Sequence, residues 1–212
     1  MELNLQIQEV LKYYPDLSFN EINNSIDGEL FISKDDSYDI SIELEPYPKH
    51  FPKVFEISER VPRKVTRHTY SDSGSCCLST QAKAQILLKT KITSLYLFVK
   101  EIVIPYFQNN SYFEINREYK TDEYAHNSFG VIEGYRDILG INNDRLILKL
   151  ILDRIRKNKL RLNDLCYCAS GCSLKKCNCG KHSIQYKNFR MIDENILIND
   201  MRHFAKHLDI KL

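Results

Sequence analysis

Cysteines are the residues of this sequence whose spacing points most directly to chemistry. The chain has 212 residues and seven cysteines, of which two are adjacent, Cys76 and Cys77, and five lie between residues 166 and 179. An odd number in two tight groups does not suit a disulfide framework, and in a reducing compartment it indicates metal binding and catalysis. The two groups therefore predict two different sites.

The loop around the first group is suited to presenting a sulfur atom to a second molecule. Gly74 lets the backbone turn with a positive φ three residues before Cys77, and Arg67 and His68 supply basic groups upstream. A cysteine that carries an acyl group as a thioester must be partly exposed, beside backbone N–H groups or cations that favour the thiolate. The alternative is that Cys76 and Cys77 are small buried apolar residues, as most free cysteines are.

Two stretches around these cysteines resemble the ubiquitin-conjugating enzymes. The first is a Tyr-Pro…Pro-x-Val turn at residues 47–54, and the second is the Gly-x-x-Cys-Leu loop at residues 74–78. In that family the active cysteine directly precedes a leucine and follows a glycine by three residues, so the resemblance selects Cys77, with Cys76 as the fallback. It implies an α+β catalytic domain over residues 1–140, built on a four-stranded antiparallel meander with covering helices.

The chain departs from the family upstream of the cysteine. Eukaryotic members carry His-Pro-Asn, whose Asn amide is credited with steadying the oxyanion, whereas the counterpart in this chain is Arg67-His68-Thr69. With no Asn available, we expect the oxyanion to be stabilised by backbone N–H groups, by the side chain of Arg67 or His68, or by another group. We expect His68 chiefly to set the geometry of the loop, with a catalytic role as the alternative.

The resemblance implies a cysteine-dependent acyl transferase with protein partners. An activating enzyme would spend ATP and pass the C-terminus of a ubiquitin-like protein, or of a cGAS-like nucleotidyltransferase, to Cys77. A lysine amine of a target protein would then attack the thioester. Residues 125–133 resemble a phrase of bacterial ubiquitin-conjugating-like proteins from anti-phage operons, which implies a CBASS-type defence system or a bacterial ubiquitin-like (Bil-type) operon. The rival is a non-catalytic adaptor of the same architecture, related to the RWD domains, in which Cys77 is inert.

The second cysteine group resembles the SEC-C zinc motif. Two Cys-x-Cys pairs are separated by eight residues, with Ser170-Gly171 as a tight turn between them. Four thiolates at this spacing can surround one tetrahedral ion, and we expect a single structural zinc. Ala169 stands where the motif has a glycine, and Cys172 and His182 compete with Cys179 for the fourth position. The predicted ligands are Cys166, Cys168, Cys177 and Cys179.

The composition describes an ordinary globular protein and predicts a cytoplasmic location. The hydrophobic fraction is 43%, the net charge is +2, and the first residues lack the basic and apolar regions of a secretory signal. No run of 18 apolar residues predicts a membrane span. A basic helix over residues 142–160 begins the second part of the chain, residues 141–212. It lacks interleaved aromatics, so nucleic acid is not the favoured partner, and nucleic-acid binding through this helix is the third alternative, which predicts a steep salt dependence.

Periodicity gives the elements that must position these residues. Apolar residues recur at helical spacing near the start of the chain, and strict alternation over residues 38–44 predicts a strand with one buried face. Residues 81–88 are expected to form an irregular connector, and Pro105 is expected to end or kink the helix that follows. The predicted helices span residues 3–14, the residues from Thr90 or Thr93 to Pro105, residues 142–160 and residues 191–212. The predicted strands span residues 17–22, 28–33, 38–44 and 54–58.

Overall fold

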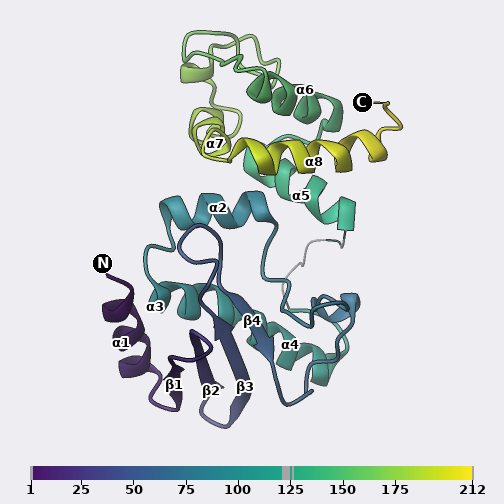
Figure 1. The fold of residues 1–212 in the computed structure, drawn as a ribbon. Helices are drawn as coiled ribbons and strands as arrows, with labels where there is room; N and C mark the ends of the chain where they lie inside the picture. The colour runs from purple at the N-terminus through teal and green to yellow at the C-terminus, as the bar shows by residue number, and fades with distance from the viewer. Residues whose placement is uncertain (1, 121–124, 126, 212) are drawn as a thin grey trace. The chain divides into compact units, whose positions relative to one another are not determined.

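The computed structural model describes residues 2–120, 125 and 127–211 (Figure 1). The chain forms two compact units: Met1–Ser79 with Leu87–Glu123, and Thr80–Ile86 with Tyr124–Leu212. The predicted boundary at residue 140 falls inside the second unit. The reason is that the helix before it, α5 (Asn127–Leu139), packs against later helices of that unit.

The first unit is built on an antiparallel sheet whose four strands follow one another in chain order. The predicted α+β class and the four-stranded meander are thereby confirmed. In the third strand Tyr38, Ile40 and Ile42 are almost fully buried, while Asp39 between them is exposed, as the alternating pattern requires. The strands are β1 (Leu17–Asn20), β2 (Ser25–Ser33), β3 (Asp36–Glu43) and β4 (Lys53–Glu56).

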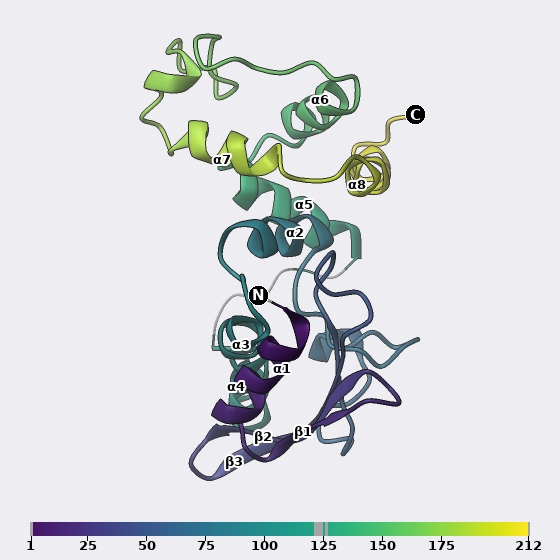
Figure 2. The same ribbon diagram turned by 60° about the vertical axis from the view of Figure 1, so that its left-hand side comes forward.

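Helices cover one face of this sheet. Figure 2 shows α1, α3 and α4 on the same side of the strands, where their apolar residues complete the core with the inward side chains of β2 and β3. Tyr38 stacks on Phe107 of α4, with ring centroids 4.6 Å apart. The bounds are α1 (Leu3–Tyr13), α3 (Leu95–Phe98) and α4 (Ile104–Asn116).

The helix that was expected to end or kink at Pro105 continues through it. A π-helical segment, Val99–Val103, joins α3 to α4, and Pro105 occupies the first turn of α4. A proline ring in a regular helix collides with the carbonyl of the residue four positions earlier, and a π turn changes that hydrogen-bonding pattern. The same run of sequence can therefore remain helical from Leu95 to Asn116.

The predicted irregular connector at residues 81–88 is wrong, because α2 (Gln81–Thr90) is helical. The Lys83 N–H donates to Thr80 Oγ1 at 3.4 Å, which is the contact of an N-cap. Gln85 is buried and anchors the helix, since its Oε1 accepts the Asp193 N–H at 2.6 Å and its Nε2 donates to the Asp193 carboxylate. The sequence signal for this helix was Thr80 as an N-cap. Polar and apolar residues alternate directly after it, so the helical periodicity is hard to recognise.

The second unit is helical and has a hydrophobic core of its own. Tyr135 of α5 lies in this core against Phe204, with ring centroids 5.6 Å apart, and its hydroxyl donates to Asp200 at 3.0 Å. The helices that the sequence predicts over residues 142–160 and 191–212 are both present in shorter form. Besides α5, the unit contains α6 (Asp144–Ile155), the 3-10 turn η3 (Leu174–Lys176), α7 (His182–Phe189) and α8 (Glu194–His207).

In the part of the chain that the structure describes, none of the helices combines the length and the apolar character needed to cross a bilayer.

Candidate functional site

The loop that carries Cys76 and Cys77 is held against the edge of the sheet. The Cys76 N–H donates to the Val54 carbonyl of β4 at 2.7 Å, and Phe55 forms an isolated bridge with Ser75. A second bridge pairs Thr69 with Cys76. These main-chain bonds fix the position of the pair relative to β4.

Gly74 closes the turn that precedes the pair. Its φ is +77°, and its N–H donates to the Tyr70 carbonyl at 2.7 Å, while the Tyr70 N–H donates to the Ser75 carbonyl at 2.9 Å. A Cβ at this position would lie 3.1 Å from Nε of Arg63, so the arginine side chain approaches the turn closely. Both the backbone conformation and this approach favour glycine, as the sequence predicted for the turn.

The two cysteines occupy different environments. Cys76 is only 7% exposed, packs in the core of the first unit, and has its pKa raised to about 12, chiefly by burial. Cys77 is partly exposed, and its Sγ lies 3.4 Å from the Tyr70 hydroxyl. A thiol that remains protonated and buried is a poor nucleophile, so accessible sulfur chemistry in this loop is available to Cys77.

His68 shapes the loop through its backbone. Its φ is +50°, its side chain is buried edge-on against Tyr119, and its carbonyl accepts the Cys77 N–H at 2.7 Å. The same carbonyl accepts the Tyr106 hydroxyl at 3.0 Å. These contacts fit the geometry-setting role expected for His68.

The Arg67 side chain is buried and binds residues of α4, away from the cysteine loop. Its Nε and Nη2 donate to Asn110 Oδ1 at 3.1 and 3.0 Å, and its guanidinium lies 4.6 Å from the centre of the Phe113 ring. Glu114 lies 3.6 Å away and also binds Arg60. Since a buried cation with these contacts joins the loop to α4, the expectation that the Arg67 side chain stabilises an oxyanion has no geometric support.

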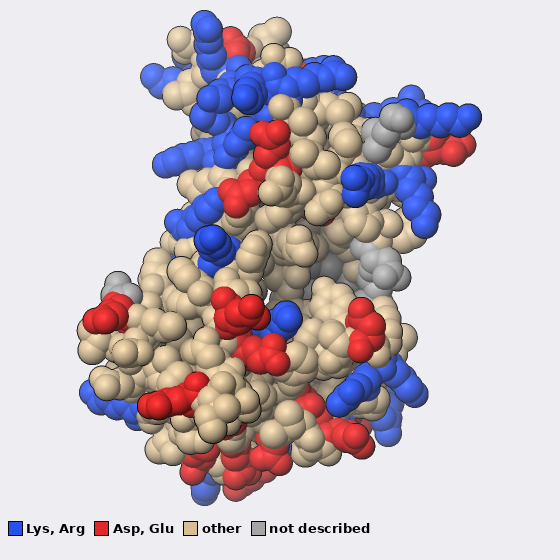
Figure 3. Space-filling view, in the orientation of Figure 1, with Lys and Arg blue, Asp and Glu red and all other residues tan. Residues whose placement is uncertain are grey.

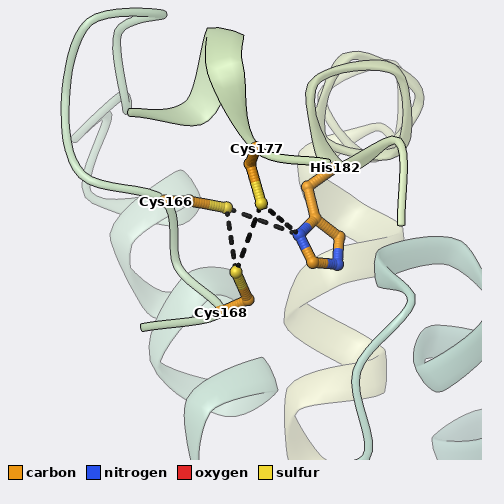
Figure 4. Close-up of side chains that lie close together, drawn as sticks. All are labelled: Cys166, Cys168, Cys177 and His182. Carbon is orange, nitrogen blue, oxygen red and sulfur yellow. Dashed lines mark hydrogen bonds between the residues drawn. The ribbon is translucent and has the colours of Figure 1, made fainter. Parts of the chain in front are cut away.

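A second candidate site is a cluster of three cysteines and one histidine in the second unit. Figure 4 shows the sulfurs of Cys166 and Cys177 beside the ring of His182, with the sulfur of Cys168 directed at the other two sulfurs. Cys168 Sγ lies 3.4 Å from each of the other two sulfurs, and His182 Nδ1 lies 3.4 Å from Cys166 Sγ and 3.3 Å from Cys177 Sγ. The four donor atoms all lie within 4.8 Å of one another.

This donor set fits a tetrahedral ion. Zinc bonds of about 2.3 Å to sulfur and about 2.0 Å to nitrogen place the ligand atoms of a tetrahedron about 3.5 to 3.8 Å apart. The four distances given above need adjustments of a few tenths of an ångström to match this spacing. Burial raises the pKa of Cys166 to about 12, whereas the Cys179 backbone N–H and the Ser170 hydroxyl lower the pKa of Cys177 to about 6. A divalent cation would stabilise the thiolate form of all three cysteines.

The fourth member differs from the predicted ligand set. Cys179, like Cys172, is exposed, and neither belongs to the group of converging donor atoms. His182 takes the fourth place because α7 begins at that residue and places its ring, only 2% exposed, against the sulfurs. The first three predicted residues are brought together as expected, and the histidine that the sequence offered as an alternative completes the group.

The turn between the two halves of the cluster places Ala169 in a conformation that favours glycine. Ala169 has φ +58° and Gly171 has φ +76°, and the Ala169 N–H donates to the Cys166 carbonyl at 3.2 Å. A left-handed backbone is the conformation that glycine adopts without strain, so the glycine of the SEC-C motif matches what the structure requires here. The Cys166 N–H donates to the Cys172 carbonyl at 2.8 Å and closes the knuckle.

Basic side chains are concentrated in the second unit, as Figure 3 shows for one face of the molecule. Residues 144–190 contain 12 Lys and Arg residues against three Asp residues, whereas the rest of the chain holds 18 basic and 25 acidic residues (30 − 12 and 28 − 3). Two of the three aspartates are paired, Asp144 with Arg136 and Asp153 with Lys149. The segment is thus strongly positive.

In the segment of residues 125–133, which the sequence analysis compared with bacterial ubiquitin-conjugating-like proteins, the structure describes one contact between its two ends. The Ala125 N–H donates to Glu133 Oε2 at 2.6 Å. His126 lies outside the described residues.

Comparison with known proteins identifies no family. No family model matches the chain, and neither the curated proteins nor the solved structures include a significant match to it. The function must therefore be argued from the two sites themselves.

Proposed function

We propose that this protein is a cysteine-dependent acyl transferase of the ubiquitin-conjugating type, with Cys77 as the nucleophile. The observation that carries the proposal is the pairing of a buried, protonated Cys76 with a partly exposed Cys77 on a loop fixed to β4. An antiparallel meander with helices on one face is compatible with such an enzyme. The motif at residues 74–78 selects the same cysteine.

The reaction consists of two acyl transfers. The Cys77 thiolate attacks the thioester carbonyl on an activating enzyme, so that a new C–S bond forms and the thiolate of that enzyme leaves. A neutral lysine amine of the target then attacks the Cys77 thioester, an isopeptide bond forms, the amine proton passes to water, and the Cys77 thiolate leaves. The acyl donor is the C-terminus of a ubiquitin-like protein or of a cGAS-like nucleotidyltransferase, in a bacterial anti-phage setting.

The cysteine–histidine cluster is proposed to hold one structural zinc. Zinc would supply binding energy for folding, since four protein ligands leave no open coordination position for a substrate. The cluster is part of the core of the second unit, where Tyr167 packs beside His182 with ring centroids 4.9 Å apart. The residues that would hold the ion are Cys166, Cys168, Cys177 and His182.

Thioester formation tests the proposal directly. The full chain is incubated with ATP, a candidate activating enzyme and a candidate modifier, and the products are separated without reductant. We expect an adduct that thiols release, that Cys77→Ala abolishes, and that Cys77→Ser converts into a reductant-resistant ester. Cys76→Ser is the matched control, because it changes the neighbouring buried sulfur and is expected to keep the adduct.

The opposite outcome would identify an adaptor. If the activating enzyme carries the modifier as its own thioester and yet no adduct forms on this chain, Cys77 is not an acceptor. The protein would then act as a non-catalytic, zinc-stabilised member of the same architecture.

A further inference from the structure

The hydroxyl of Tyr70 lies beside the sulfur that the proposed function uses. The Cys77 thiol donates to Tyr70 Oη at 3.4 Å, a normal length for a hydrogen bond that involves sulfur. Tyr70 is about half exposed, so its ring forms part of the accessible wall next to Cys77. The contact joins two side chains seven residues apart, on either side of the turn that Gly74 closes.

The backbone fixes the tyrosine relative to the cysteine. The Tyr70 N–H donates to Ser75 and the Tyr70 carbonyl accepts the Gly74 N–H, so both main-chain groups of Tyr70 are bound within the turn. The neighbouring residue, Thr69, is bridged to Cys76. The phenol is therefore held at the sulfur by the same bonds that hold the loop on β4.

Three of the groups expected to stabilise charge at this loop are engaged elsewhere. The Cys77 N–H donates to the His68 carbonyl at 2.7 Å, the Cys76 N–H donates to Val54, and the Arg67 guanidinium binds Asn110. A phenol can reverse its role, because its O–H rotates and donates when the sulfur loses its proton. Burial, together with the contact to Cys77, raises the pKa of Tyr70, so the phenol keeps that proton at neutral pH.

We propose that Tyr70 is a catalytic residue of the Cys77 site, whose hydroxyl donates a hydrogen bond to the Cys77 sulfur when that atom is negatively charged. It would act before the first acyl transfer, when Cys77 is a thiolate nucleophile, and again in the second, when the Cys77 thiolate leaves. This inference deepens the proposed transferase function and rests on it for the catalytic role. The contact itself is testable without any acyl donor.

The first measurement is the pH dependence of Cys77 alkylation in the full chain. Iodoacetamide is used as the probe, and modification of the Cys77 peptide is followed by mass spectrometry. Hydrogen bonds to charged groups are strong enough that losing one should move the midpoint of this profile upward by about one pH unit in Tyr70→Phe. Tyr119→Phe is the matched control, since the Tyr119 hydroxyl donates to the Thr66 carbonyl in the same segment, and its midpoint should not move.

The second measurement separates the contact from catalysis. Once the wild-type protein is shown to form the Cys77 thioester, discharge of that thioester to free lysine is compared with discharge in the variants. Tyr70→Phe should slow the discharge about ten-fold, while Tyr119→Phe should discharge at the wild-type rate. An unchanged alkylation midpoint in Tyr70→Phe would overturn the inference even if thioesters form. An unchanged discharge rate would also overturn the catalytic role. If no thioester forms on wild-type protein, the proposed function fails, and a shifted alkylation midpoint would show that Tyr70 still acts on Cys77.

Discussion

Replacing His182 tests which residue completes the metal cluster. In His182→Asn the ring that lies 3.3 Å from Cys177 Sγ and 3.4 Å from Cys166 Sγ is lost, and the new side chain cannot reproduce an imidazole nitrogen. In Cys179→Ser a sulfur outside the group of converging donors is changed. The structure therefore predicts opposite results for two substitutions only three residues apart.

The size of the effect follows from the number of ligands. Structural zinc sites bind with about 10–16 kcal/mol at neutral pH, which is about 2.5–4 kcal/mol for each of four ligands. His182→Asn should thus weaken zinc binding by about 70- to 900-fold. Because His182 is 2% exposed, water enters its place only if the knuckle opens, which would enlarge the loss. Cys179→Ser should change the affinity by less than about three-fold.

Competition with a chromophoric chelator measures the affinity, and the metal content of the purified protein gives the stoichiometry. Cobalt substitution adds a readout of ligand type, because thiolate charge-transfer absorption reports on the number of sulfurs: three are expected in the wild type and in Cys179→Ser. The reasoning is refuted if Cys179→Ser loses the metal and the sulfur absorption falls, while His182→Asn keeps both. Removal of the metal should also lower the Tm of the second unit, whose core contains Cys166 and Cys177.

Three further predictions concern single residues. Native protein treated with iodoacetamide should be modified at Cys77 well before Cys76, as read by peptide mapping, and equal rates would contradict the buried position of Cys76. Ala169→Gly should raise stability in the zinc-loaded protein by about 1 kcal/mol in urea unfolding, because φ there is +58°, and a loss of stability would argue against that conformation. Burial raises the pKa of Asp200 to about 6, so the folded state binds more protons than the unfolded state between about pH 4 and pH 6. This residue therefore makes stability fall as pH rises through that window, by up to about 3 kcal/mol, and Asp200→Asn should remove that part of the pH dependence while leaving the rest of the profile unchanged.

The sheet could be predicted from the sequence because its pattern is local. Alternation over residues 38–44 assigns one face of β3 to the core whatever the rest of the chain does, and short connections favour antiparallel neighbours. The cysteine cluster could be predicted for the same reason, since closely spaced Cys-x-Cys pairs and a turn bring three sulfurs together within one short segment. The Ala169 departure was visible in the sequence too, although its conformation was not.

Long-range packing decided the rest. Whether a cysteine is buried depends on side chains far along the chain, and only the fold separates Cys76 in the core from Cys77 at the surface. Arg67 is basic in either setting, but α4 brings Asn110 to it from 43 residues away and removes it from the cysteine loop. His182, and not Cys179, belongs to the group of converging donor atoms because the start of α7 places its side chain against the sulfurs, an orientation that no spacing rule contains.

The sequence by itself determined which residues are candidates for nucleophilic and metal-binding chemistry, and the order of the strands in the sheet that carries the first cysteine pair. Tertiary structure decided which of those residues meet: a phenol with a sulfur at one site and an imidazole with three sulfurs at the other. The physical reason is that residue type and periodicity are properties of neighbouring positions, whereas burial and side-chain contact depend on how distant segments pack in the folded chain.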